Sequence, residues 1–323
     1  MSEQADLKKF LAALSKTHEI IISQIKDMER PVIEALPSGS FTIDHAMGIG
    51  GYPRGRIIEI FGQPSGGKTT VSLLAIAETQ KNGGTCAFID VEHSLDLDWA
   101  AKLGVDVPKL IFTQPDSGEQ ALNVVEELAG SGLVDLIVLD SVAALTPQSE
   151  IDGEIGDQQM AVMARMMGQA LRKLVPVVSK SKSALVFINQ VREGLNPYGE
   201  KEVTPGGKAL KFFSSIRLSV KKMSGSDIKD GERIVGHRIE ISVKKNKVAP
   251  PFQKAELTLN FLSGIDRVDE LCTLGLMTEV ITQAGPMYRV GRVTAKGYDD
   301  LVGQVRPDLE LQKEIWKAIK EKK

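Results

Sequence analysis

The sequence predicts an α/β fold with a mostly parallel sheet covered by helices on both faces. Apolar runs that read as buried strands occur at RIIEIFG (56–62), CAFIDVE (86–92), VDLIVLDS (134–141) and ALVFINQ (184–190). Helical patterns alternate with them, at KTTVSLLAIAETQKNG, over 118–132 and within 157–181. Glycines mark several of the turns between them. Near-continuous apolar strands that alternate with helices are typical of a parallel sheet buried on both faces.

Three flanking regions follow other patterns. Residues 214–223, 237–247 and 254–261 alternate apolar and polar side chains, which predicts antiparallel strands that extend the sheet. Short helical segments and a Gly-rich hairpin at 284–293 predict a small α+β C-terminal domain over 264–323. At the other end, 3–29 carries apolar residues at helical spacing, and Pro31 should end that helix. This N-terminal segment (1–30) would dock on a neighbouring subunit or on the chain's own core (31–263).

The composition is that of a globular protein, with 42% hydrophobic and 25% charged residues in 323. No window holds 18 uninterrupted apolar residues, and the N-terminus lacks the layout of a secretory signal, so we expect no membrane contact. Cys86 and Cys272 lack CxxC spacing and are expected to be buried thiols, which fits a cytoplasmic protein. The four histidines are scattered, which argues against a zinc site.

Charge is unevenly distributed along the chain although the net charge is only −2. Residues 86–160 hold fifteen Asp and Glu against two Lys, whereas 201–247 hold twelve Lys and Arg against five acidic residues. This asymmetry indicates either one basic face suited to an anionic partner or solvated charge on unrelated faces.

A phosphate-binding motif, GxxxxGK[ST], stands directly after a predicted strand and directly before a predicted helix. This context is the one that a P-loop requires, because backbone N–H groups and the helix N-terminus together cradle phosphates. Lys68 would reach the β- and γ-phosphates, and Thr69 would bind Mg²⁺. The residues of this predicted site are Gly62, Gln63, Pro64, Ser65, Gly66, Gly67, Lys68, Thr69 and the following Thr70.

Polar residues end three of the predicted strands. Asp140 ends VDLIVLD, where the second Mg²⁺-binding carboxylate of a P-loop protein belongs, although a helix cap would also explain it. Glu92 follows CAFID and could activate a water, but Asp90 or a cap would serve the spacing equally well. Gln190 ends the fourth strand, where it could sense the γ-phosphate or be a simple strand-end amide.

A long polar segment follows Gln190, from about Val191 to Gly207. Loops of this length are uncommon and are usually functional or disordered. It offers the cations Arg192, Lys201 and Lys208 and several glycines, but Tyr198 is its only aromatic residue. One aromatic residue is too few for a stacking platform, so the binding groups that the segment offers are cations and backbone N–H groups, which suit phosphates.

Taken together, these pieces resemble the bacterial RecA recombinases over nearly the whole chain. The resemblance rests on TIDHAMGIGGYPRGRIIEIFGQPSGGKTT, CAFIDVEHSLD, LDSVAALTPQSEIDGEIGD, FINQVR, TPGGKALKFFSSIRL and VKKNKVAPPF. It implies a RecA-type P-loop ATPase core that uses ATP and Mg²⁺. It also implies head-to-tail helical filaments on single-stranded DNA, pairing with double-stranded DNA, and promotion of self-cleavage by SOS-type repressors. Rival readings are a ring helicase on the same fold, or a small-molecule kinase or nucleotide-regulated scaffold without DNA.

The resemblance also assigns roles to residues. Glu92 matches the residue that activates the water, Gln190 the γ-phosphate sensor, and Lys245 and Lys247 a pair that reaches the neighbouring subunit's ATP. Asp96, Trp99 and Phe261 match positions around the nucleotide, with Trp99 in place of the more usual Tyr, and Phe212 matches an interface position. Two DNA-binding loops are implied, one over Gly153–Met160 and one over about Val191–Gly207. The DNA-binding residues implied are Gly153, Met160, Arg165, Arg172, Arg192, Tyr198, Gly206, Gly207 and Lys208. The chain has no acidic C-terminal tail, so self-inhibition by such a tail is not expected.

Overall fold

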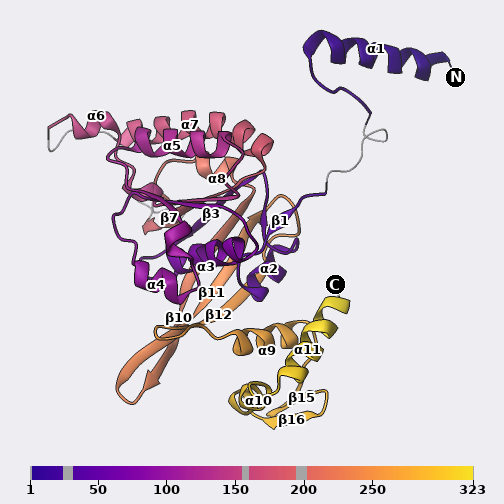
Figure 1. Cartoon of the computed structure of the whole chain (residues 1–323), viewed down its shortest axis with the longest axis vertical. Coiled ribbons are helices and arrows are strands. Elements are labelled where there is room, and N and C mark those ends of the chain that lie inside the picture. Colours follow the sequence, from indigo (N-terminus) through magenta and orange to yellow (C-terminus); the bar gives the residue numbers. More distant parts are fainter. Residues whose placement is uncertain (1, 25–31, 155–159, 194–201, 323) are drawn as a thin grey trace. The chain divides into compact units, whose positions relative to one another are not determined.

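The computed structural model describes residues 2–24, 32–154, 160–193 and 202–322 (Figure 1). Contacts between residues divide the chain into two units, Met1–Ile33 and Glu34–Lys323. No further division falls within 34–323, so a separate domain from residue 264 stays a prediction.

The N-terminal unit contains one helix, α1 (Ser2–His18), among its described residues. The prediction of a helix over 3–29 is wrong in extent, because the helix ends at His18. Glu19 takes a left-handed φ of 53°, and the Ser15 hydroxyl accepts a hydrogen bond from the backbone N–H of Ile22 at 2.9 Å. Three consecutive isoleucines at 20–22 also disfavour helix, since β-branched side chains lose rotamer freedom there.

The larger unit is built on a nine-stranded sheet, as far as the described residues go, and this confirms the predicted fold class. The strand order is β13-β12-β11-β10-β3-β7-β6-β4-β5. Neighbours from β10 to β5 pair in parallel, while β10, β11, β12 and β13 pair antiparallel. In chain order these strands are β3 (Ile57–Gly62), β4 (Cys86–Asp90), β5 (Ile111–Thr113), β6 (Leu136–Asp140), β7 (Ala184–Gln190), β10 (Ile216–Asp230), β11 (Arg233–Asn246), β12 (Lys254–Asn260) and β13 (Gly264–Ile265).

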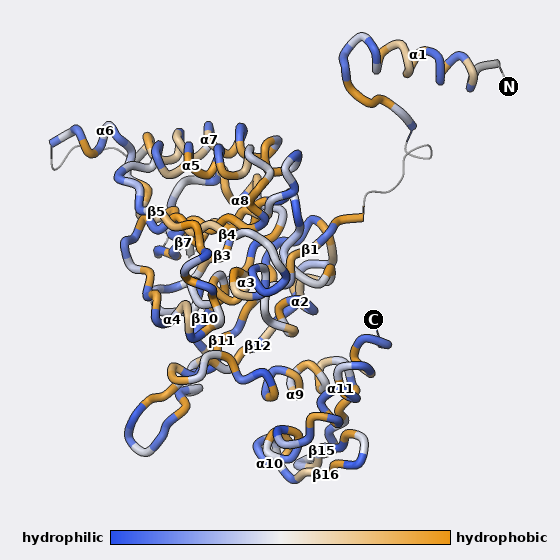
Figure 2. The backbone as a smooth tube through the Cα atoms, in the orientation of Figure 1, coloured by the Kyte–Doolittle hydropathy of each residue, from blue (hydrophilic) through white to orange (hydrophobic). Residues whose placement is uncertain are grey.

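Helices cover both faces of this sheet (Figure 1). One apolar cluster joins alternate strand residues to α2 (Phe41–Met47) and α3 (Lys68–Lys81). The other joins the remaining strand residues to α5 (Gly118–Gly130), α7 (Met160–Ser181) and α8 (Ala209–Phe213). Figure 2 shows the consequence as apolar strands running through the centre between mixed helices. Shorter elements are β1 (Ala35–Leu36), β2 (Tyr52–Pro53), α4 (Leu97–Lys102), α6 (Gln148–Ile151), β8 (Arg192–Glu193) and β9 (Glu202–Val203).

Three features of the core differ from the sequence-based expectation. The β10–β11 hairpin extends well past the predicted 214–223 and 237–247. The sequence pattern missed its outer part because the residues there are mostly exposed and polar and show little apolar alternation. Strand β5 and helix α2 are short elements for which no pattern was recognised. Their stability depends on packing against the sheet, which a short sequence window cannot reveal.

The C-terminal region has an apolar core of its own, which includes the buried Cys272. Three helices surround it: α9 (Arg267–Met277), α10 (Tyr298–Val305) and α11 (Leu309–Glu321). A small antiparallel sheet of β14 (Thr282–Ala284), β15 (Met287–Val290) and β16 (Val293–Lys296) completes it. The predicted short helices and hairpin are therefore present.

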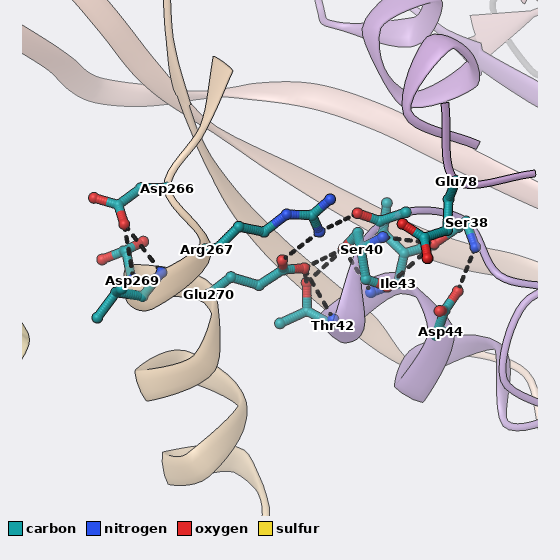
Figure 3. Close-up of polar contacts among 12 residues, drawn as sticks. Ser38, Ser40, Thr42, Ile43, Asp44, Glu78, Asp266, Arg267, Asp269 and Glu270 are labelled. Atoms are coloured by element: carbon teal, nitrogen blue, oxygen red, sulfur yellow. Dashed lines mark hydrogen bonds and ion pairs between the residues drawn. The ribbon is translucent and has the colours of Figure 1, made fainter. Parts of the chain in front are cut away.

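A buried glutamate connects this region to the start of α2 (Figure 3). The side chain of Glu270 is 1% exposed, and its Oε1 accepts hydrogen bonds from the Ser40 hydroxyl and from the Thr42 N–H and hydroxyl. Arg267 donates to the Gly39 carbonyl and lies 3.3 Å from Glu270 Oε2. A carboxylate removed from water is tolerated when its acceptor sites are filled in this way.

Two further observations concern the chain as a whole. Among the described residues, no helix has the length and apolar character needed to cross a membrane. Cys86 and Cys272 are both free, buried thiols, and burial raises the pKa of each to about 12. The prediction that both are buried thiols is confirmed, and thiols with such raised pKa values are expected to be unreactive.

Candidate nucleotide and DNA sites

The glycine-rich motif forms a tight loop between β3 and α3. A side chain at Gly62 would place its Cβ 2.0 Å from the carbonyl oxygen of Val220, so only glycine fits beside β10. Gly67 and Ser65 have φ of 94° and 57°, in the left-handed region that a phosphate-cradling loop uses. The N-terminus of α3 follows at Lys68 and directs unpaired N–H groups toward the loop.

Lys68 is held inside this loop rather than extended into solvent. Its side chain is 8% exposed, and its Nζ donates to the Gln63 carbonyl at 2.9 Å. Burial lowers the pKa of Lys68, an effect opposed by the nearby carboxylates of Asp140 and Glu92. The ammonium group is thus close to the position that a phosphate chain would take, and a phosphate would replace the carbonyl as a better acceptor.

Thr69 and Asp140 face each other across the loop. The Thr69 hydroxyl donates to Asp140 Oδ2 at 2.7 Å, and Asp140 is 3% exposed. Burial raises the pKa of Asp140 to about 7, with Glu92 and Asp90 adding to the rise and Thr69 and Lys68 opposing it. A buried carboxylate with weak compensation is the kind of group that a cation would stabilise.

This pair fits Mg²⁺ as the P-loop class uses it. No cluster of three or more His, Cys, Asp and Glu that could hold a metal is found in the described part of the chain. Mg²⁺ needs no such cluster, because it keeps several waters and takes one or two protein oxygens plus phosphate oxygens. The Thr69 hydroxyl and the Asp140 carboxylate are the two protein oxygens that the arrangement offers.

Asp90 and Glu92, which residue spacing could not separate, have different surroundings in the structure. Asp90 is 1% exposed and accepts hydrogen bonds from the N–H groups of Ser94 and Leu95 and from the Gln114 amide. It therefore holds the chain after β4 in place. Glu92 is less buried and faces the nucleotide site, where its charge acts on Lys68.

Two hydrogen bonds orient the Glu92 carboxylate. Its Oε1 accepts from the Ser141 hydroxyl at 2.5 Å and from the Gln190 side-chain amide at 2.7 Å. Ser141 directly follows Asp140, and Gln190 ends β7 next to β3. A polar path thus connects Thr69 with Gln190. Thr69 contacts Asp140, the next residue Ser141 contacts Glu92, and Glu92 contacts Gln190, which precedes the predicted DNA-binding loop at about Val191–Gly207.

A cavity of about 440 Å³ is lined on one side by the glycine-rich loop, including Lys68. Asp96, Trp99 and Phe261 line it together with His237, so the structure brings the three predicted nucleotide-binding residues together. Asp96 caps α4 by accepting from the Trp99 N–H, and the Trp99 indole donates to the Thr70 hydroxyl at 3.2 Å. The apolar rings and the volume suit a nucleotide base and sugar.

Lys245 and Lys247 do not line this cavity. Both ammonium groups lie at the carboxyl end of α8, where Lys245 donates to the carbonyls of Lys211 and Phe212 and Lys247 donates to that of Phe212. Burial lowers the pKa of Lys245 to about 8, with contributions from Lys247 and Arg217. The Phe212 side chain is 65% exposed. Cations held away from the chain's own nucleotide cavity, next to an exposed aromatic ring, suit a contact with another subunit.

The predicted DNA-binding residues are only partly described. Gly153, Arg165, Arg172, Arg192, Gly207 and Lys208 are exposed, and Gly206 is buried. Arg165 and Arg172 are seven residues apart on α7 and so project from one side of that helix. Met160 begins α7, but its side chain lies outside the described residues, as does Tyr198.

Gly206 and Gly207 fix the returning end of the second loop against the core. Their φ values are 84° and 74°. A Cβ at Gly206 would lie 2.8 Å from Val142, and one at Gly207 would lie 2.9 Å from Ala164 of α7. These glycines let the backbone pass close to the helix that follows the first loop. The structure therefore indicates a packing role for them beside any contact with phosphates.

Several residues near the site carried no sequence signal. Ser141 orients Glu92, and His237 lines the cavity. Glu59 on β3 forms a buried polar group with Asn189 and Arg217, which lie on the two neighbouring strands β7 and β10. A charged residue inside the apolar run RIIEIFG was the one available hint for Glu59. The partners come from strands far apart in sequence, so spacing could not pair them.

The fold and the site define a P-loop nucleotide-binding protein, in which the carboxyl ends of parallel strands meet the glycine-rich loop. The family model described as the RecA N-terminal domain matches residues 6–266. The chain belongs to the RecA family.

Curated relatives agree with this over most of the chain. The chain is 50% identical to Protein RecA of Thermus aquaticus over 303 residues, which cover 93% of this chain and 89% of the relative. It is 47% identical to Protein RecA of Thermus thermophilus over 324 aligned residues, covering 99% and 95%. Protein RecA of Staphylococcus epidermidis is 46% identical over 303 residues, covering 93% and 86%.

Proposed function

We propose that this protein is an ATP- and DNA-dependent homologous recombinase that forms helical filaments on single-stranded DNA. The observation that carries the proposal is the hydrogen-bonded path Thr69–Asp140 and Ser141–Glu92–Gln190, which ends where the second long loop begins. Such a path lets the state of the nucleotide influence the loop, and the loop's cations suit a phosphate backbone. Family membership supports both halves of the proposal.

In the proposed reaction, catalysis is by positioning and by electrostatic stabilisation. Backbone N–H groups of the loop and Lys68 bind the phosphates, while Thr69 and Asp140 are the residues that would hold Mg²⁺. A Mg²⁺ ion held there would supply positive charge that neutralises charge developing on the phosphates. Glu92, oriented by Ser141, accepts a proton from the attacking water.

Gln190 is proposed as the γ-phosphate sensor. Its amide nitrogen carries two N–H donors and now gives one to Glu92 at 2.7 Å. A γ-phosphate oxygen would be a second, charged acceptor within the same site, and a charged acceptor forms the stronger hydrogen bond. Movement of the amide toward it would also pull on Val191, whose N–H donates to the Gly62 carbonyl at 3.3 Å.

Assembly is proposed to be head to tail, with the nucleotide between successive subunits. Lys245 and Lys247 would then act in trans on the neighbour's phosphates, as an arginine finger does. Heterologous contacts that do not close into a ring produce open filaments. The N-terminal segment 1–30, the core 31–263 and the C-terminal domain 264–323 are the proposed functional divisions. A cytoplasmic location, pairing with double-stranded DNA and promotion of SOS-type repressor self-cleavage complete the proposal from family membership.

Electron micrographs of the protein with single-stranded DNA and a slowly hydrolysed ATP analogue test the assembly. Open helical filaments are expected, together with strand exchange between homologous DNA molecules when ATP is supplied. Closed rings would indicate a ring-type motor on the same fold and would contradict the proposal.

A further inference from the structure

Glu59 is a buried carboxylate on the P-loop strand that the proposed reaction does not use. Its side chain is 0% exposed, and it lies directly opposite Arg217 in the parallel pairing of β3 and β10. Arg217 Nε donates to Glu59 Oε2 at 2.5 Å, and Asn189 Nδ2 donates to Glu59 Oε1 at 3.1 Å. Both carboxylate oxygens therefore have partners within the sheet.

Such a pair is not explained by stability alone. Removing two charges from water is costly, and well-packed apolar residues of similar volume often stabilise a core as well or better. The side chains that share a face of the sheet with this pair are apolar: Ile57 and Phe61 on β3, and Phe187, which pairs with Glu59 on β7, are all buried. A polar group in this position is better explained by its hydrogen bonds, which fix the positions of the side chains that it contacts.

Asn189 is the residue through which that geometry reaches the proposed site. Its Oδ1 accepts from the backbone N–H of Gln190 at 3.0 Å, and its Nδ2 also donates to the Pro205 carbonyl at 3.2 Å. One fully buried amide thus connects the proposed sensor with the returning end of the second loop, next to the closely packed Gly206.

Arg217 extends the group in the opposite direction. Its guanidinium lies 4.4 Å from the ring centroid of Phe61, the residue before Gly62 of the P-loop. In the antiparallel pairing of β10 and β11, Arg217 is opposite Lys245. The group formed by Glu59, Asn189 and Arg217 therefore lies between the sensor and the pair of lysines proposed to act on the neighbouring subunit.

We propose that Glu59 is a positioning residue that, through Asn189, holds Gln190 and Pro205 in one fixed relation. The fixed relation is what lets a change at the γ-phosphate alter the second loop, and DNA on that loop alter hydrolysis. The inference rests on the proposed function, because it concerns the coupling between ATP and single-stranded DNA. The alternative is that the group is only a structural part of the core.

Two single substitutions break the Glu59–Asn189 hydrogen bond in different ways. In Glu59→Gln the new side chain has only one acceptor oxygen. If that oxygen accepts from Arg217, the NH₂ group of the glutamine faces the Asn189 Nδ2 donor, and the hydrogen bond to Asn189 is lost. In Asn189→Asp two carboxylates face each other. The double variant E59Q/N189D restores one amide-to-carboxylate hydrogen bond and the original net charge, and its new carboxylate still accepts from the Gln190 N–H. That carboxylate cannot donate to the Pro205 carbonyl.

The experiment measures three quantities in each variant: the thermal midpoint, the affinity for a fluorescent ATP analogue, and the ratio of ATP hydrolysis rates with and without poly(dT). We expect both single variants to bind the analogue within about twofold of the unmodified protein, because the P-loop is intact. The ratio should fall about tenfold, the effect of one lost hydrogen bond to a charged group. The double variant should recover most of the midpoint while its ratio stays low, because the contact with Pro205 is still missing.

Matched controls separate positioning from packing. Glu240→Gln changes a carboxylate on β11 that pairs with Lys254 at 2.8 Å outside this group, and it should leave all three quantities unchanged. If Glu59→Gln does not fold, Asn189→Asp and Arg217→Lys carry the same test. The inference is overturned if the single variants keep the full ratio, or if the double variant recovers the ratio together with the midpoint. Absence of any poly(dT) effect in the unmodified protein would instead contradict the proposed function.

Discussion

The Gln190 amide donates a hydrogen bond to the Glu92 carboxylate at 2.7 Å, although 98 residues separate them in sequence. Glu92 follows β4 and Gln190 ends β7, with β6 between the two strands. The contact joins the proposed water-activating residue to the proposed start of a DNA-binding loop. Under the proposed function, hydrolysis and DNA binding would affect each other through this contact.

Glu92→Gln should bind ATP with nearly unchanged affinity and hydrolyse it at least about a hundredfold more slowly, since general bases typically contribute about 10²–10⁴-fold. Single-turnover hydrolysis together with equilibrium ATP binding checks this. Asp90→Asn is the matched control, because its carboxylate holds backbone N–H groups of the β4 turn. It should lower thermal stability more than it lowers the rate of the folded protein. The reverse pattern would assign water activation to Asp90.

Lys245 should give the DNA-stimulated reaction an alkaline limit. Burial and neighbouring cations lower its pKa from 10.5 to about 8, so the ammonium is lost over a range where an ordinary lysine stays charged. At low ATP, the stimulated rate should fall as pH rises past about 8, because the charge acting on the neighbour's phosphates disappears. Lys245→Arg should remove this fall, since arginine stays protonated. A pH profile that is identical in both proteins would exclude the in-trans role.

The lowered pKa of Lys245 also affects stability: the free energy of unfolding should rise with pH, whereas the stimulated rate should fall. The folded chain binds fewer protons at Lys245 than the unfolded chain between pH 8 and 10.5. The contribution of this residue to the free energy of unfolding therefore becomes more favourable as pH rises through that window. Denaturant unfolding at pH 8 and pH 10 should show a larger gain for the native chain than for Lys245→Met. An equal gain in the two proteins would place the pKa of Lys245 near its usual value.

Glu270→Ala should destabilise the folded chain by about 3 kcal/mol, because a buried carboxylate is lost and the donors of Ser40 and Thr42 are left unpaired. Denaturant unfolding monitored at Trp316 is a direct measurement, since this residue packs on Phe41 at the same junction. Glu310→Ala is the control: its ion pair with Lys313 is solvent-exposed on both sides and should contribute less than about 1 kcal/mol. Equal effects of the two substitutions would show that the hydrogen bonds of Glu270 to Ser40 and Thr42 do not stabilise the folded chain more than an exposed ion pair does.

Lys68→Ala should abolish both ATP hydrolysis and tight assembly on DNA. The ammonium held at the Gln63 carbonyl lies inside the loop where the phosphates would bind, and the variant loses it without changing the glycines of the loop. Fluorescent ATP analogue binding and light scattering of the protein with DNA check the two effects. Normal strand exchange by this variant would refute the site.

How far the sequence leads can be judged from particular elements. The P-loop and Asp140 were predictable because their residues are contiguous or end an apolar strand, and the structure places Thr69 and Asp140 2.7 Å apart. Residue spacing alone could not separate Asp90 from Glu92, because Asp90 ends β4 and Glu92 follows two residues later; the resemblance favoured Glu92, and their hydrogen-bond partners show how their surroundings differ. The predicted range of the N-terminal helix was too long, because apolar residues continue at helical spacing past His18 whereas the backbone turns at Glu19.

Contacts between distant segments account for most of what the sequence missed. The anchors of Glu270 on Ser40 and of Glu59 on Arg217 each join residues more than 150 positions apart. No local pattern marks such pairs, because they depend on which strands become neighbours in the sheet. The resemblance indicated Lys245 and Lys247 as a pair, but not that both hold the carboxyl end of α8 beside Phe212.

The most direct test of the central claim is the rate of ATP hydrolysis by the unmodified protein, with Mg²⁺, as single-stranded DNA is titrated in. The account predicts that the rate rises with DNA and saturates, and that Gln190→Ala hydrolyses ATP slowly but loses the rise. A rate that stays constant across the titration would contradict the coupling of ATP and DNA, and with it the proposed function.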